Sequence, residues 1–348
     1  MGEKGPSLSL TSFLLGAAMA VACIFFYMSA YPKGERWSQL SSWSDGADIQ
    51  SLKVMNEEQL ALAKENKAQQ ELSVLLKKAA MDDNTVIITS LNEPWARPGS
   101  LLDLFLESFR EGEQISHLLN HLVIVAMDPK AYQRCKEVHF YCYFLETKGV
   151  NYTTEKFFMT KDYLEMMWGR NGFQLSILEL GYNFLFTDVD IVWFRNPLRH
   201  IAITSHIAIS SDFFIGDEDD LSNFPNGGFL YARSCNKTIQ FYRNWHNARD
   251  EFPGMHEQNV FNQIKKNYTE KMGVKLQFLD TAYCGGFCQL SNDFNKICTL
   301  HANCCVGLGS KIVDLRNVLE SWKYYKSFSL EERKQKQFHW KVPGICIH

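Results

Sequence analysis

Asp188 and Asp190 stand one residue apart in the segment "GYNFLFTDVDIVWFRNP", residues 181–197. The apolar run just before them is typical of a buried strand, and a hydrophobic core gains nothing from two neighbouring like charges. Residues two apart in an extended segment lie on the same side of the chain, so both carboxylates can reach one ligand. Hard divalent cations prefer oxygen ligands and keep positions for substrate phosphates. We therefore predict that the pair holds a divalent cation, which would neutralise the charge of a departing diphosphate.

The same segment fits a second kind of enzyme. "FLFTDVDIV" resembles the start of a haloacid-dehalogenase-type phosphatase, with Asp188 as nucleophile and Asp190 as general acid and base. The acidic run "GDEDD" at 216–220 could supply further metal ligands. That motif normally opens its domain, whereas three strand–helix units precede it here. We keep the phosphatase as the lesser alternative.

Alternating strand and helix patterns place the pair in an α/β domain. Strands are expected at 85–91, 121–127, 140–146 and 182–188, with helices at 97–112, 128–137 and 161–180 between them. Continuous apolar strands separated by helices indicate a parallel sheet covered on both faces. Ligands of such sheets bind beyond the carboxyl ends of the strands, where the aspartates stand. Further strands at 205–213, 227–234 and 274–280 and helices at 236–249 and 256–267 are expected to extend the domain.

Residues 8–31 contain no charged residue and would span roughly 36 Å as a helix, enough to cross a bilayer. A cleaved signal peptide is the alternative, but the apolar run is longer than such peptides usually have. Three N-glycosylation sequons, at Asn151, Asn236 and Asn267, have meaning only if the body is lumenal. We therefore expect a single-pass type II membrane protein. Its predicted parts are a cytosolic tail at 1–7, a signal anchor at 8–31, a stem with a spacer helix at 32–83, a catalytic domain at 84–330 and a C-terminal tail at 331–348.

Nine of the ten cysteines lie in the body, and five of them cluster between 284 and 305. This density suits an oxidising compartment. A zinc site built from the cluster and His301 is the alternative, but the usual C-x-x-C spacing is missing. We expect disulfides, with at least one cysteine left free or paired between chains because the count is odd. The net charge of −3 and the absence of a long Lys/Arg block argue against a nucleic-acid partner.

Six blocks of the sequence resemble one known family. They are "LNEPWARPGSLLDLFLESF", "EKFFMTKDYLEMMWGRNGFQLSILELGYNFLFTDVDIVWFRNP", "PNGGFLYARSCNKTIQFYRNWHNAR", "HEQNVFNQIK", "FLDTAYCGGFCQLS" and "CTLHANCCVGL". From about Val86 to Tyr325 the chain resembles the plant nucleotide-diphospho-sugar transferases of glycosyltransferase family 77, which include rhamnogalacturonan II xylosyltransferases and arabinosyltransferases of hydroxyproline-rich wall proteins. The resemblance implies an α/β GT-A fold, with a Rossmann-like mixed sheet flanked by helices, in a type II Golgi protein. It also implies a UDP-sugar donor, dependence on Mn²⁺ and retention at the anomeric carbon.

The resemblance assigns metal ligands. Asp188 and Asp190 match the family's D-x-D motif, with Asp190 the more direct ligand, and His301 in "LHANC" matches a late histidine that completes the site. The alternative for His301 is a buried, hydrogen-bonded histidine beside the cysteines. Neutral imidazole is a good ligand for manganese-type ions, which favours the metal role.

Other matches lie on the donor side. Thr89 and Ser90 close the first strand, where such folds meet the nucleotide. Arg170 is expected to contact diphosphate or ribose, and its alternative is a surface charge. Asn226, Gly227 and Gly228 match a segment whose backbone approaches the donor sugar, which glycine permits; the alternative is a β-turn.

Glu257 and Gln258 match the family's acidic-Gln pair near the reaction centre. We expect Gln258, more than Glu257, to contact the donor sugar. The alternative is that both are polar residues on the exposed side of the helix that begins there.

These assignments predict transfer of a pentose such as xylose or arabinose from UDP to a cell-wall polysaccharide or glycoprotein. The leaving phosphate could take the acceptor proton in a front-face displacement, whereas a double displacement would need a carboxylate nucleophile, for which Glu257 is the candidate. The non-enzyme alternative is a degenerate Golgi member that binds a glycan or a partner without turnover. Association in the Golgi, with itself or with another protein, is a further expectation.

Overall fold

We describe a computed structural model of the chain, which covers residues 46–146 and 159–346. The contacts divide the chain into two units, Met1–Gln70 and Glu71–His348, and the account below concerns the second. The predicted anchor at 8–31 and the sequon at Asn151 lie outside the described residues. Within the part that the structure describes, no helix is long and apolar enough to cross a membrane.

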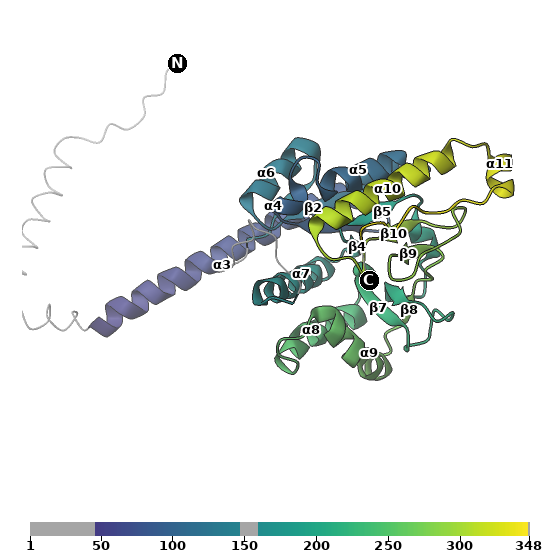
Figure 1. The fold of residues 1–348 in the computed structure, drawn as a ribbon. Helices are drawn as coiled ribbons and strands as arrows, with labels where there is room; N and C mark the ends of the chain where they lie inside the picture. The colour runs from purple at the N-terminus through teal and green to yellow at the C-terminus, as the bar shows by residue number, and fades with distance from the viewer. Residues whose placement is uncertain (1–45, 147–158, 347–348) are drawn as a thin grey trace, which may run out of the picture. The chain divides into compact units, whose positions relative to one another are not determined.

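Seven strands form one mixed sheet in the order β3-β2-β1-β4-β7-β6-β8 (Figure 1). Their bounds are β1 Thr85–Leu91, β2 Leu122–Ala126, β3 Cys142–Phe144, β4 Asn183–Thr187, β6 Ile207–Phe213, β7 Phe224–Ala232 and β8 Leu276–Phe278. β1 to β4 are mutually parallel, as the sequence predicts. β7 runs antiparallel to both β4 and β6, so the second half of the chain extends the sheet and makes it mixed.

Helices cover both faces of the sheet, because alternate strand residues point to opposite faces. Ile87 belongs to a hydrophobic cluster with α5 and α10, whereas Ile88 belongs to a cluster with α7, α8 and α9. Figure 1 shows these two groups of helices on opposite sides of the strands. The helix bounds are α3 Gly46–Ala79, α4 Glu93–Ala96, α5 Leu101–Glu111, α6 Pro129–Val138, α7 Lys161–Glu179, α8 Asn236–Asn247, α9 Glu257–Met272, α10 Leu308–Lys326 and α11 Leu330–Gln335, with 3₁₀ turns η1 Ser116–His121, η2 Pro197–His200 and η3 Ala248–Asp250.

The C-terminal part of α3 corrects one prediction. The stem helix was expected to act only as a spacer because its apolar stripe is thin. Leu72, Leu76 and Ala79 are instead buried and join the cluster that contains α7 to α9. Three side chains at helical spacing are enough to dock the last two turns against the domain.

A second, three-stranded sheet was not predicted. It consists of β5 Ile191–Trp193, β10 Thr299–His301 and β9 Cys284–Gly286, in that order. β10 runs antiparallel to β5 with His301 opposite Ile191, and the Ala302 amide donates to the Asp190 carbonyl at 3.0 Å. Each strand has only three residues, which is too short for a periodic pattern in the sequence. This sheet therefore places His301, at the end of β10, beside the aspartates that follow β4.

The predicted disulfides are confirmed. The bonds join Cys135 to Cys142, Cys288 to Cys304 and Cys305 to Cys346. Cys235, Cys284 and Cys298 are free thiols, in line with the odd cysteine count. The alternative zinc site is not formed among the described residues, because three of the five clustered cysteines are bonded and His301 lies elsewhere.

The C-terminal segment, which the sequence left unassigned, packs on the same unit. It begins with α11 and ends at Cys346, whose disulfide joins it to Cys305. The buried Asp314 of α10 accepts backbone N–H groups of Gly344, Ile345 and Cys346 at 2.9–3.2 Å. This carboxylate fixes the last described turn of the chain.

Candidate active site

Asp188 and Asp190 lie at the carboxyl end of β4, where that strand leads into β5. The Asp188 amide donates to the Gly228 carbonyl of β7 at 2.6 Å, so the turn is attached to the neighbouring strand. Asp188 is half-buried, and Asp190 is only 2% exposed. A carboxylate this deeply buried needs a cationic or hydrogen-bonding partner.

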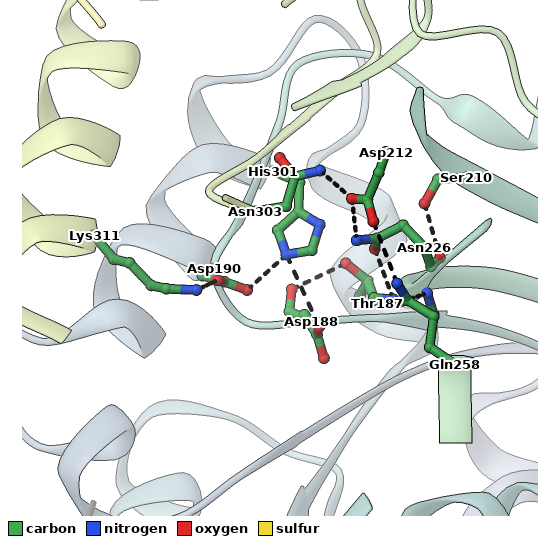
Figure 2. A network of polar contacts seen from close by, with 12 residues as sticks. Thr187, Asp188, Asp190, Ser210, Asp212, Asn226, Gln258, His301, Asn303 and Lys311 are labelled. Atoms are coloured by element: carbon green, nitrogen blue, oxygen red, sulfur yellow. Dashed lines mark hydrogen bonds and ion pairs between the residues drawn. The ribbon is translucent and has the colours of Figure 1, made fainter. Parts of the chain in front are cut away.

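His301 reaches the aspartates from β10 (Figure 2). Its Nε2 lies 3.3 Å from Asp190 Oδ1 and 3.9 Å from Asp188 Oδ2. One ligand atom from each of Asp188, Asp190 and His301 can be chosen so that all three lie within 4.8 Å of one another. The structure thus brings together the three residues that the sequence named as metal ligands.

The chemistry of this set fits a divalent cation. Two carboxylates and one imidazole are ligands that Mn²⁺ and Mg²⁺ accept. Asp190 Oδ1 is buried, and its 3.3 Å contact with His301 Nε2 does not have the geometry of a hydrogen bond. A buried carboxylate oxygen in that condition is costly, and coordination to a cation would satisfy it.

Lys311 is a site residue that the sequence did not reveal. It stands in the first turn of α10, and its Nζ lies 2.6 Å from Asp190 Oδ2 and over the Trp95 ring at 5.6 Å (Figure 2). Burial acts to raise the pKa of Asp190, but Lys311 and then His301 outweigh it and hold that pKa well below its usual range. Asp190 is therefore ionised at neutral pH.

Arg170 of α7 joins the aspartates to the start of α9. Its guanidinium donates to Asp188 Oδ1 at 2.9 Å and to Glu257 Oε1 at 2.6 Å. It also lies over the Phe186 ring at 4.6 Å. Both Arg170 and Glu257 are buried, so the alternatives that made Arg170 a surface charge and Glu257 an exposed helix residue are wrong.

Asn226, Gly227 and Gly228 lie inside β7 rather than in a β-turn, so that alternative is also wrong. A shift in the register between β6 and β7 occurs beside them, where the pairing passes from Ile209–Leu230 to Ser210–Asn226. A Cβ on Gly228 would lie 2.5 Å from His301 Cε1 and 2.6 Å from Asp188 Oδ2. Glycine therefore allows the strand to approach two of the three candidate ligands, Asp188 and His301.

Gln258 and Asn226 meet at a second carboxylate, Asp212 of β6. Asp212 accepts the side-chain amides of Asn226 and Asn303 at 2.8 Å each and that of Gln258 at 3.2 Å (Figure 2). Gln258 Oε1 in turn accepts the Gly227 amide at 2.9 Å. The sequence shows Asp212 only as one acid near the end of a strand, so its place in this network could not be predicted from the pattern.

Thr89 and Ser90 close β1, as expected. They line a small cavity that also contains Arg170 and Phe173, so they lie on the Arg170 side of the site. Thr89 is fully buried, and its hydroxyl has no hydrogen-bond partner among the described residues. The Thr89 hydroxyl is therefore available to a polar ligand group.

The family model described as nucleotide-diphospho-sugar transferase matches residues 117–315. The uncharacterized protein At4g15970 of Arabidopsis thaliana is 44% identical over 279 residues, which cover 80% of this chain and 74% of that protein. The beta-arabinofuranosyltransferase RAY1 of the same plant is 44% identical over 70 residues, covering 19% of this chain and 13% of its own. Among solved structures, a glycosyltransferase involved in glycosylation of the major capsid of PBCV-1 aligns with a TM-score of 0.40 and 12% identity, over 67% of this chain and 98% of that one. The match to the family model confirms the resemblance to nucleotide-diphospho-sugar transferases drawn from the sequence.

Proposed function

The chain belongs to the nucleotide-diphospho-sugar transferase family and is a glycosyltransferase, and we propose that it moves a sugar from a UDP-sugar to a hydroxyl of a cell-wall polysaccharide or glycoprotein. The proposed sugar is a pentose such as xylose or arabinose, transferred with retention on a GT-A fold. The proposed cofactor is Mn²⁺ or Mg²⁺. One observation carries the proposal: Asp188, Asp190 and His301 converge at the carboxyl end of β4, with one ligand atom of each within 4.8 Å of the others.

Asp188, Asp190 and His301 would hold the cation, which when bound supplies positive charge that stabilises the departing diphosphate. Arg170 fixes the Asp188 carboxylate through a partly buried contact of 2.9 Å. Lys311 neutralises Asp190 in the free protein and is placed to exchange that contact for a phosphate oxygen.

The group around Asp212 would bind the donor sugar. Asn226, Gln258 and Asn303 present amide groups next to this carboxylate, and amides and carboxylates suit sugar hydroxyls as donors and acceptors. Since Gln258 also accepts the Gly227 amide, its orientation is fixed by the backbone of β7. This supports Gln258 as the donor-sugar contact.

The environment of Glu257 favours a front-face displacement. Its Oε1 is bound to Arg170 at 2.6 Å, and its Oε2 lies 3.1 Å from His256 Nδ1. His256 Nδ1 accepts from the Gln258 amide, so Oε2 has no hydrogen-bond partner among the described residues and the carboxylate is held through Oε1. A buried carboxylate paired with a guanidinium suits a positioning role better than that of a nucleophile. The leaving phosphate would then accept the proton of the attacking hydroxyl.

The phosphatase alternative is not supported. Asp188, its proposed nucleophile, is ion-paired with Arg170 and lies beside His301. The acidic run at 216–220 contributes no ligand to the described metal-binding cluster. The family match assigns transfer of a sugar instead.

We further propose that the catalytic domain is lumenal in the Golgi, as a type II membrane protein anchored by residues 8–31, and that it can associate there with itself or another protein. Three disulfides within 278 residues of one unit support an oxidising compartment.

Titration calorimetry of the full chain in detergent with UDP tests the function. Binding should require Mn²⁺ and should be lost in Asp190→Ala, while the exposed control Asp250→Ala binds as the wild type does. A screen of UDP-sugars for metal-dependent hydrolysis then identifies the donor. A degenerate glycan-binding protein would show no metal-dependent UDP binding, and full hydrolysis by a well-secreted Asp190→Ala variant would contradict the metal assignment.

A further inference from the structure

A second cavity lies apart from the site described above. Its volume is about 590 Å³, within the range of small-molecule sites. β5 leads from Asp190 to Arg195, and β10 leads from Cys298 to His301; Arg195 and Cys298 both line the cavity. The cavity and the aspartates therefore flank opposite ends of three-residue strands, each roughly 10 Å long.

The lining of this cavity is electropositive. It contains the side chains of Arg195, Arg199 and Lys296 but a single acid, Glu113. Both oxygens of Glu113 are in use, since Oε2 lies 2.9 Å from Arg195 Nε and Oε1 lies 2.6 Å from Arg333 Nη1. The one carboxylate of the lining is thus neutralised by two guanidinium groups and offsets neither Arg199 nor Lys296.

Arg195 forms a fixed part of the wall. Besides Glu113, it donates to the carbonyls of Phe294 and Ile297 and to the Tyr325 hydroxyl. The positive charge of Arg195 therefore acts on the cavity, although its N–H groups are already hydrogen-bonded within the protein.

Arg199 and Lys296 are the cations available to a ligand. Arg199 is exposed and forms no ion pair with any residue that the structure describes. Among the residues that the structure describes, the ion pairs of Lys296 are limited to a surface contact of 3.8 Å with Asp293, with both side chains about half exposed. Such pairs contribute little and exchange readily. A guanidinium can bind a carboxylate through two parallel N–H bonds, which the nearby ammonium would reinforce.

Aromatic and amide groups complete the lining. The His200 and Tyr283 rings stack at 3.9 Å with an interplanar angle of 21°. Burial lowers the pKa of His200, so its ring is neutral at pH 7. Gln114 and Asn295 add amides that can bind hydroxyls. The two further carboxylates that act on His200 have partners of their own: Glu218 accepts from Gln277, and Asp280 accepts from the Ala282 amide.

We propose that this cavity binds a carboxylated sugar, such as a uronic acid unit, with Arg199 and Lys296 on the carboxylate and the His200–Tyr283 pair beside the ring. The choice of a saccharide over a free anion rests on the proposed function, since a glycan acceptor is the polyhydroxylated polymer that this protein meets. The site would hold a segment of the acceptor remote from the reacting hydroxyl.

Calorimetry with the full chain in detergent tests the site with three probes: tetragalacturonate, the neutral maltotetraose of the same chain length, and inorganic phosphate. We expect tetragalacturonate to bind, to weaken as NaCl rises from about 50 to 300 mM, and to exceed each of the other two probes at least tenfold in affinity. The double variant Arg199→Gln/Lys296→Gln should lose at least tenfold in tetragalacturonate affinity. The control Lys130→Gln/Arg316→Gln removes one lysine and one arginine that are exposed outside the cavity and should bind as the wild type does.

Unchanged tetragalacturonate affinity in the cavity variant overturns the site. Equal binding of phosphate, or of maltotetraose, overturns the assignment of a carboxylated sugar. Mn²⁺-dependent UDP binding is measured on the same samples and should be unaffected by the cavity variant. A protein that binds tetragalacturonate through Arg199 and Lys296 but never binds UDP would refute the donor proposal and leave the cavity proposal standing.

Discussion

The ammonium of Lys311 lies 2.6 Å from Oδ2 of Asp190, although 121 residues separate them in the chain. The contact places a fixed positive charge on the same carboxylate that we assign to a divalent cation. Cation and ammonium would therefore repel each other until a diphosphate arrives to compensate both charges. We therefore expect the site to bind the metal weakly when no nucleotide is present.

Replacing Lys311 by methionine should change metal and nucleotide binding in opposite directions. We expect Lys311→Met to bind Mn²⁺ alone about tenfold more tightly, because the competing charge is gone, and to bind UDP in the presence of Mn²⁺ about tenfold more weakly. Calorimetry in the two formats measures both. If Lys311→Met changed both affinities in the same direction, the proposal that Lys311 moves from Asp190 to a phosphate oxygen would be contradicted.

Gly228→Ala should disable the site without unfolding the protein. Its Cβ would lie 2.5 Å from His301 Cε1 and 2.6 Å from Asp188 Oδ2, so at least one candidate ligand must move. We expect a loss of at least a hundredfold in metal-dependent UDP-sugar hydrolysis. Gly169→Ala is the matched control: Gly169 lies within α7, and a Cβ there meets nothing within 4 Å. That control should keep full activity and gain about 0.5–1 kcal/mol in stability.

The buried pair Arg170–Glu257 should show strong coupling in a double-mutant cycle. Arg170→Met leaves Glu257 buried without its guanidinium partner, which should cost about 3–5 kcal/mol in the free energy of unfolding. Glu257→Gln in that background should recover part of the loss because it removes the isolated charge. Urea denaturation of the wild type, both single variants and the double variant gives the coupling. Additive effects would show that the pair does not act as a unit.

The burial of Lys265 predicts that the stability of the protein depends on pH. Its Nζ donates to the Asn223 carbonyl at 2.7 Å, and burial lowers its pKa to about 8 from a usual value near 10.5. Between these two values the unfolded chain binds this proton more strongly than the folded chain, so the contribution of Lys265 to stability rises with pH across that window. The wild type should therefore gain stability relative to Lys265→Met when urea unfolding is compared at pH 7.5 and 9.5. If the difference in unfolding free energy between the wild type and Lys265→Met stays constant, or changes in favour of the variant, the buried amine is not desolvated in this way.

The sequence predicted the metal pair because the signal is local: Asp188 and Asp190 interrupt an apolar strand. β1, β2 and β4 were predicted for the same reason, since each is a short, continuous apolar run. His301 was assigned to the same site as the aspartates only through the family resemblance. The neighbouring cysteines suggested a zinc site as the alternative and gave no link to Asp190, which His301 reaches through β10, a strand of three residues.

Lys311 and Asp212 could not be found from the chain alone. A lysine in the first turn of a helix is ordinarily solvated, and only the tertiary position of α10 turns it toward Asp190. Asp212 similarly looks like a strand-end acid until three amides from β7, α9 and the segment after β10 converge on it. For Arg170 the sequence left two interpretations open, a ligand contact and a surface charge. The spacing of apolar residues in α7 did not decide between them, because burial depends on how the helix packs.

The pairing of β10 with β5 also bears on how this chain could change in evolution. A single-residue insertion within β10 before His301 would turn its imidazole to the opposite face and separate it from Asp190. Between the two strands, from 194 to 298, insertions in surface loops would leave that pairing intact. We therefore expect insertions and deletions among functional relatives to occur in those loops and to be absent at residues 191–193 and 299–301. A collection of homologous sequences would reveal this pattern without any measurement of activity.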